Sequence, residues 1–170
     1  AFICGPEPMM LAIAGALKDI AGELPLIFPV HPRTRANIEK FGIDLGPNVT
    51  LAGPQAYMAF LNLWKDAAVV LTDSGGVQEE APSLGKPVLV MRENTERPEA
   101  VTAGTVKLIG TDEERIVTEV DRLLNDADAY QAMANAVNPY GDGKAAERSL
   151  AAIEQMFDVG RRVADFDSQA

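Results

Sequence analysis

Cysteine and histidine are almost absent from this 170-residue sequence, because each occurs only once, as Cys4 and His31. A single cysteine cannot form an intramolecular disulfide or a cysteine-rich zinc site. A Ser-His-Asp triad would have to use His31. Disulfide-stapled folds and cysteine metal clusters are therefore excluded, and we assign no catalytic residue, no metal site and no cofactor.

Long apolar runs and basic clusters are also lacking. No apolar run is long enough to span a membrane, and residues 1–20 have no basic segment before an apolar one, so we expect a cytoplasmic protein without a membrane partner. Acidic residues outnumber basic ones by 25 to 15, which gives a net charge of −10 and argues against nucleic acid as a partner. Backbone N–H groups can still bind a small anion.

Short apolar runs alternate with segments of helical pattern along the chain. The runs are 2–4, 26–30, 49–51, 67–72, 88–91 and 106–109, and helices are expected at 7–22, 33–41, 55–66 and 75–84, with two or three more over 112–158. This alternation predicts an α/β fold, with a Rossmann-like parallel sheet and helices on both faces. We expect one domain over residues 1–160 and a loose tail at 161–170.

The stretch "LTDSGGVQEE" places a glycine turn at the end of the predicted strand 67–72. Ligands of open α/β sheets bind at the carboxyl ends of the strands, and Gly75 and Gly76 would let a ligand approach the backbone closely. The spacing is neither Walker A nor G-x-G-x-x-G. Because Val77 cannot complete a capping box with Ser74, the first helical amides could serve a diphosphate.

Glu80 lies one helical turn after Gly76, and therefore on the same face of the predicted helix. Its carboxylate could accept hydrogen bonds from the hydroxyls of a sugar attached to that phosphate. Glu79 is expected to point to solvent. The alternative is an ordinary strand-to-helix turn with a capping serine and two solvated glutamates.

Three separate stretches carry a family resemblance. "LTDSGGVQEEAPSLGKPVLVMRENTERPEAVTAGTVKLIGTD", "FPVHPRTR" and "NPYGDGKA" closely resemble the C-terminal half of the non-hydrolysing UDP-N-acetylglucosamine 2-epimerases, over about residues 24–157. The resemblance implies one half of a glycosyltransferase B-type architecture, which closes with a second Rossmann-like domain on a nucleotide sugar. It implies a diphosphate at Ser74, Gly75 and Gly76, ribose at Glu80, uracil at Gln55 and Phe60, and Arg97 facing the ligand.

Each implied role has a structural alternative. Phe60 belongs to an apolar stripe and could be core, while Gln55 could simply begin a helix. Arg97 could pair with Glu93 or Glu99 as a solvated contact. "NPYGDGK" could be only a turn between helices, and for His31 a structural and a functional role are equally supported.

The opening "AFICGPEPMMLAIAGAL" departs from the family, which normally has a histidine–arginine motif here. Residues 1–10 instead resemble the C-G-P-x-x-M loop of ferredoxin-reductase-type NAD modules, at Cys4, Gly5, Pro6 and Met9. A strand ending in a Gly-Pro turn before a helix is the structural alternative. A splice replacing the first βα unit and a divergent or truncated natural chain both explain the departure.

The resemblance implies inversion at C2 of UDP-N-acetylglucosamine, giving UDP-N-acetylmannosamine through elimination and re-addition of UDP. The family's acid and base residues come from an N-terminal domain that this sequence lacks, so we expect a UDP-binding domain with little or no epimerase activity. The expected partners are UDP or UDP-N-acetylglucosamine, the N-terminal domain and, through exposed apolar surface, further copies of the chain. The alternatives are a noncatalytic or chimeric α/β domain with a vestigial nucleotide site, and half of a B-type glycosyltransferase.

Overall fold

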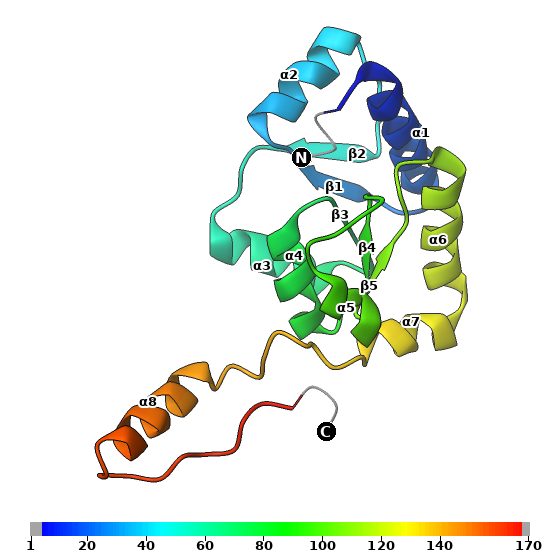
Figure 1. Ribbon diagram of the computed structural model, residues 1–170. Helices are drawn as coiled ribbons and strands as arrows, with labels where there is room; N and C mark the ends of the chain where they lie inside the picture. Colours follow the sequence, from blue (N-terminus) through cyan, green and yellow to red (C-terminus); the bar gives the residue numbers. More distant parts are fainter. Residues whose placement is uncertain (1–4, 168–170) are drawn as a thin grey trace.

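The computed structural model describes residues 5–167, in which strands and helices alternate as far as α6 (Figure 1). In chain order the elements are α1 Glu7–Glu23, β1 Leu26–Pro29, α2 Pro32–Phe41, β2 Val49–Ala52, α3 Tyr57–Asp66, β3 Val70–Thr72, α4 Gly75–Glu80, the 3-10 helix η2 Ala81–Leu84, β4 Val88–Val90, α5 Pro98–Ala103, β5 Val106–Leu108, α6 Glu113–Asn125, α7 Ala127–Ala134 and α8 Ala145–Met156. The strand expected at 2–4, and Cys4 with it, lies outside the described residues.

The strands form two parallel sheets. β1 pairs with β2, with Leu26 opposite Val49, and the other sheet has the order β3-β4-β5. The expected parallel pairing is confirmed, and no strand within residues 5–167 pairs with both groups. Because β3, β4 and β5 are parallel, their carboxyl ends meet at one edge, and the loops that follow β3 and β4 begin there.

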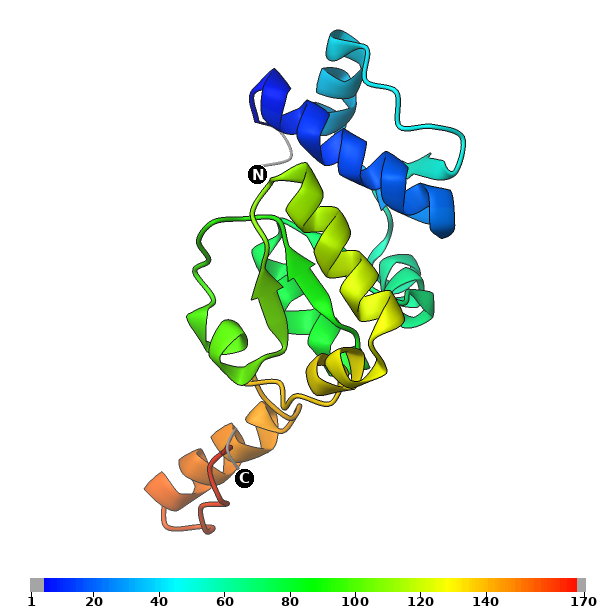
Figure 2. The same ribbon diagram turned by 90° about the vertical axis from the view of Figure 1, so that its right-hand side faces the viewer.

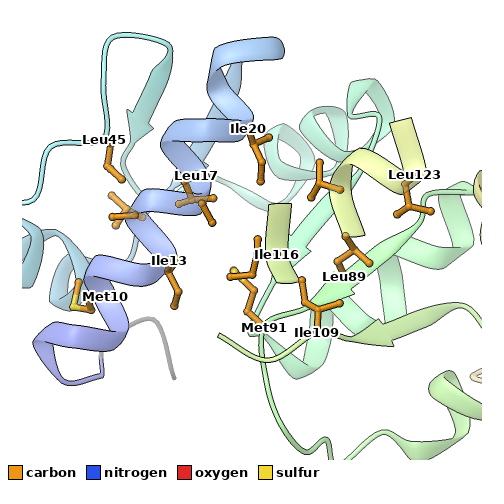
Figure 3. Close-up of a cluster of buried hydrophobic side chains, with 14 of the residues drawn as sticks. Met10, Ile13, Leu17, Ile20, Leu45, Leu89, Met91, Ile109, Ile116 and Leu123 are labelled. Carbon is orange, nitrogen blue, oxygen red and sulfur yellow. The ribbon is translucent and has the colours of Figure 1, made fainter. Parts of the chain in front are cut away.

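Helix α1 joins the two sheets into one body. It contacts β1 and β2 and runs beside α6, as Figure 2 shows. Its buried face includes Ile13, Leu17 and Ile20, which lie in one apolar cluster with Leu89 of β4 and Ile116 of α6 (Figure 3). Burial of this shared cluster is the main attraction between the sheets, because apolar area removed from water is the dominant favourable term in folding.

The three-stranded sheet is covered by helices on both faces, as the alternation of apolar runs predicts. Leu89 of β4 faces the cluster shared with α1 and α6, whereas its neighbours Val88 and Val90 face a second cluster that includes Trp64 of α3 and Ala100 of α5. Successive side chains of a strand point to opposite faces, so a strand buried on both faces reads as a continuous apolar run.

Two helix predictions differ from the structure. The helix expected over 75–84 changes at Glu80 into the 3-10 turn Ala81–Leu84, where Pro82 has no N–H to continue the α-helical bonding. Helix α5 was not expected, because six residues are too few to show a helical period.

Helix α8 projects away from the rest of the molecule (Figure 1). Ala151 is its buried residue, whereas Leu150, Ile153 and Met156 expose 57%, 52% and 71% of their surface. Residues 161–167 contain neither helix nor strand, and Arg148 of α8 donates a hydrogen bond to the Ala164 carbonyl at 2.9 Å. Among the helices of residues 5–167, none has both the length and the apolar character that crossing a membrane requires.

Candidate functional site

Asp73 and Ser74 lead from β3 into α4, whose first two residues are Gly75 and Gly76. Ser74 occupies the N-cap position, but its side chain makes no capping hydrogen bond to the first amides of α4. The Ser74 N–H donates to the Thr72 hydroxyl at 3.0 Å, which holds the turn against the end of β3. Neither Gly75 nor Gly76 has positive φ. These glycines are therefore suited to close approach of a ligand rather than needed for an unusual backbone conformation.

The Glu96 carboxylate lies against this turn. A Cβ atom built on Gly75 would be 2.6 Å from Glu96 Oε1, whereas one on Gly76 would have only Glu80 Oε1 at 4.0 Å. Arg92 Nη1 holds the other oxygen of Glu96 at 2.6 Å. The pKa of Glu96 is lowered, first by its own backbone N–H and then by Arg92 and Arg97, so the carboxylate beside the turn is an anion.

Glu80 is bonded to the first residue of α3. The Tyr57 hydroxyl donates to Glu80 Oε2 at 2.7 Å, and the tyrosine is 60% exposed. This hydrogen bond raises the pKa of the Tyr57 hydroxyl, because ionising it would leave two anions in contact. The contact brings the loop after β2 beside α4, although β2 and β3 belong to different sheets.

Glu79, which we expected to point to solvent, keeps 37% of its side chain exposed but is paired with Arg97, which the sequence did not predict. Its carboxylate accepts a hydrogen bond from Arg97 Nε, and this pair raises the pKa of the Arg97 guanidinium. The ion-pair partner of Arg97 is therefore Glu79 and neither Glu93 nor Glu99, and Arg97 Nη1 also donates to the Glu96 carbonyl. Helical spacing placed Glu79 on a different face from Glu80, but it could not show that the loop after β4 packs on that face.

Gln55 and Phe60 flank the N-terminus of α3. Gln55 is exposed, lies two residues before the helix, and donates from Nε2 to the Gly53 carbonyl at 2.8 Å. Phe60 is half-buried, and its ring packs on Trp64 with 4.5 Å between the ring centroids. Phe60 thus contributes to the apolar cluster and still has part of its surface open.

His31 caps a helix. Its Nδ1 accepts a hydrogen bond from the Arg33 N–H at 3.2 Å, and Pro32 follows at the first helical position. The bond requires a lone pair on Nδ1, so the structural role of His31 is to begin α2.

The "NPYGDGK" loop is fastened to the end of α4. Asn138 Nδ2 donates to the Glu79 carbonyl at 2.8 Å and to the Ser83 hydroxyl at 2.7 Å, while Asn138 Oδ1 accepts from the Tyr140 N–H. The loop is therefore more than a turn between helices, because its Asn138 amide donates to a carbonyl of α4 and to a hydroxyl of η2 where one helix changes into the other.

The structure brings most of the expected residues into one connected group. Ser74, Gly75, Gly76 and Glu80 lie on α4 and at its start, and Arg97 is bonded to this helix through Glu79. Gln55 and Phe60 lie near the start of α3, whose Tyr57 bonds to Glu80, but their own side chains bond to Gly53 and pack on Trp64. Sequence reasoning missed Tyr57, Gln78, Thr95 and Asn138. The polar Gln78 at an apolar-facing helix position was a readable signal, whereas Tyr57, Thr95 and Asn138 bond to residues distant in sequence.

The chain has the features of a Rossmann-like domain. Its strands are parallel, and the glycines, the arginine and the carboxylates of the candidate site lie at the carboxyl edge of those strands. The chain belongs to the UDP-N-acetylglucosamine 2-epimerase family, whose model matches residues 5–154. It is one half of that family's glycosyltransferase B-type architecture. The match begins well before residue 24, where the motifs placed its start, so α1 also belongs to the family region.

Named relatives agree with this assignment. The chain is 56% identical over 147 residues to the UDP-N-acetylglucosamine 2-epimerase of Escherichia coli K12, which covers 84% of this chain and 39% of that protein. It superposes on a putative UDP-N-acetylglucosamine 2-epimerase from Listeria monocytogenes with a TM-score of 0.85 and 41% identity, over 96% of this chain and 45% of that one. The Neisseria meningitidis enzyme bound to UDP-GlcNAc gives a TM-score of 0.75 and 41% identity, over 85% and 40%. The chain thus spans less than half the length of these relatives.

Proposed function

We propose that this chain is the UDP-holding domain of a UDP-N-acetylglucosamine 2-epimerase. Ser74, Gly75 and Gly76 bind the diphosphate through the turn after β3, and Glu80 binds the ribose hydroxyls. Gln55 and Phe60 lie at the uracil, and Arg97 faces the ligand.

The observation that supports this proposal best is the convergence of three loops. The segments after β2, β3 and β4 are joined by the Tyr57–Glu80 hydrogen bond and the Arg97–Glu79 ion pair. Backbone amides suit phosphate oxygens, and a carboxylate acceptor suits a vicinal diol. The relative from Neisseria meningitidis was solved with UDP-GlcNAc bound, which supports this ligand class.

In the proposed reaction, the sugar loses the C2 proton and the UDP oxygen leaves C1, which gives a glycal and free UDP. Re-addition of UDP at C1 and of a proton at the other face of C2 gives the epimer. Ser74, Gly75, Gly76 and Glu80 keep the departed UDP in place for its return. Holding a leaving group that must return lowers the entropic cost of the second step.

Calorimetric titration with UDP tests the site. Glu80→Ala and Ser74→Ala should each weaken UDP binding about tenfold or more, because each removes hydrogen bonds to the ligand, those of Glu80 being charge-assisted. Glu147→Ala, which removes an exposed carboxylate on α8, is the matched control and should leave binding unchanged. Absence of binding at millimolar UDP would overturn the proposal and favour a vestigial site.

Glu96→Gln should have the opposite effect on UDP affinity at the same site. Its carboxylate lies beside Gly75, where it repels an incoming diphosphate. The neutral variant should therefore bind UDP more tightly than the original chain, by a factor that shrinks as salt is added. Weaker binding by this variant would contradict a phosphate position at Gly75.

The acid and base groups for the C2 proton are proposed to lie in the rest of the protein. The chain alone should then convert no UDP-N-acetylglucosamine when the reaction is followed by proton NMR. Production of the manno epimer by the chain alone would refute this division of roles.

Self-association of the chain is proposed to use exposed apolar surface, of which α8 offers Leu150, Ile153 and Met156. Sedimentation velocity should show a species larger than a monomer that shrinks when Leu150 and Ile153 are replaced by serine. A strictly monomeric original chain would refute it.

A further inference from the structure

Gln78 is a polar side chain buried completely inside the candidate site. It has no exposed surface, although its neighbour Val77 shows that this part of α4 packs against the apolar cluster under the sheet. A buried amide costs free energy unless both its donor and its acceptor are bonded. In Gln78 both are, because Nε2 donates to the Ser74 carbonyl at 3.1 Å and Oε1 accepts from the Thr95 hydroxyl at 2.6 Å.

Thr95 extends this connection to the next loop. Its Oγ1, which donates to Gln78, also accepts a hydrogen bond from the Arg97 N–H at 3.0 Å. One continuous chain of hydrogen bonds therefore runs from the backbone of Ser74, after β3, to the backbone of Arg97, after β4. These two residues are separated by more than twenty positions in sequence, and both are proposed to meet the ligand.

The hydrogen-bond chain and the ion pair constrain different parts of Arg97. Glu79 binds the guanidinium, whereas Thr95 holds the backbone N–H from which the side chain departs. An apolar residue of similar size would fill the space of Gln78 at a lower desolvation cost. A hydrogen bond specifies distance and direction more narrowly than an apolar contact does. A polar residue at position 78 is therefore useful where the distance between the loops after β3 and β4 has to be fixed.

We propose that Gln78, acting through Thr95, is a positioning residue that sets the distance between the diphosphate turn at Ser74 and Arg97. It touches no ligand itself. The ligand group it serves is the diphosphate of a nucleoside diphosphate, and to that extent the inference rests on the proposed function. An amide suits the task because it donates at one end and accepts at the other, which neither an ionised glutamate nor a leucine does.

Three variants of the full chain test the connection without nucleotide. Gln78→Leu removes both bonds, Thr95→Val removes the hydroxyl at nearly constant volume, and Thr95→Ser keeps the hydroxyl. Amide hydrogen exchange at Arg97, followed by NMR, should become faster in the first two variants and stay unchanged in Thr95→Ser. Unchanged exchange in Thr95→Val would overturn the inference whether or not the chain binds UDP, and this variant also covers the case in which Gln78→Leu fails to fold.

Titration with UDP and with uridine separates positioning from general support of the fold. Thr95→Val should lose about tenfold in affinity for UDP and nothing for uridine, which has no diphosphate, while Thr95→Ser should bind both like the original chain. Equal losses for the two ligands would assign Gln78 and Thr95 to the fold alone and overturn the positioning role. Failure of the unmutated chain to bind UDP would overturn the proposed function and this diphosphate role together, whereas the exchange result decides the hydrogen-bond chain independently.

Discussion

Helices α4 and α8 are opposites in how they are connected to the rest of the molecule. α4 has six residues, and its last three each bond to a different partner: Gln78 to Thr95, Glu79 to Arg97 and Glu80 to Tyr57. α8 has twelve residues and buries Ala151. Its residue Arg148 bonds to Asp142 and to the Ala164 carbonyl, both in the segments that adjoin the helix.

The difference shows that the length of a helix says little about how much the fold depends on it. Most helical stability in proteins comes from tertiary packing, and an isolated helix of twelve residues is marginal in water. α4 is too short to be stable by itself, so its position depends on the sheet below it and on the loops it bonds. α8 is long enough to show a helical pattern in its sequence, but it buries little of its surface against the rest of the molecule.

The largest difference between the two helices is expected when an aspartate replaces one apolar residue of each, because only the α4 site is buried. Val77→Asp places a carboxylate at a site that is 7% exposed, whereas Leu150→Asp places one at a site that is 57% exposed. The first should lower the free energy of unfolding by about 3 kcal/mol or more, and the second should change it by about 0.5 kcal/mol or less. Urea unfolding followed by circular dichroism measures both, and comparable losses would contradict the comparison.

A smaller effect is expected where the 138–144 loop meets α4. Asn138→Ala removes hydrogen bonds to the Glu79 carbonyl and the Ser83 hydroxyl, and should cost about 1–2 kcal/mol of unfolding free energy. Asn135→Ala, which removes an exposed bond to Gln131 just after α7, is the control and should cost about 0.5 kcal/mol or less. If both variants have the same midpoint, the loop does not support α4.

The smallest effects concern pH, and they have opposite signs in the two regions. The Tyr57 pKa is raised by Glu80. The contribution of this hydrogen bond to the free energy of unfolding is therefore complete below the unfolded pKa of about 10, and it is lost as pH rises through the folded pKa. The Asp142 pKa is lowered by Arg148. The contribution of this ion pair to the free energy of unfolding is therefore complete above the unfolded pKa of about 4, and it is lost as pH falls through the folded pKa.

NMR titration can follow each contact separately. The Tyr57 ring signals should shift at a higher pH in the original chain than in Glu80→Gln, and the Arg148 Hη signals, which report the bonds to Asp142, should lose their protection only in acid. Both losses should be slight, because these contacts are open to solvent. A Tyr57 transition that Glu80→Gln leaves in place would show that the hydrogen bond is not formed in solution.

The elements of the fold were largely predictable from residue pattern. Runs such as Val88–Val90 are continuous and apolar because they are buried on both faces, and "NPYGDGK" interrupts the helices where α7 and α8 are separate. The change from α4 to η2 was not predicted, although Pro82 was visible. Proline interrupts the interior of an α-helix but is tolerated in its first turn. Until the ends of the helix are known, the sequence does not show which of these two positions Pro82 occupies.

The sequence by itself determined the α/β class, the glycine turn after β3 and the family, because apolar period, turn residues and long motifs are local properties of the chain. Tertiary structure alone decided that Glu79 binds Arg97, that Tyr57 covers Glu80 and that Gln78 connects two loops. Those contacts depend on which loops the parallel strands bring to one edge. Spacing along a helix gives the face on which a side chain lies, and only packing shows what lies opposite that face.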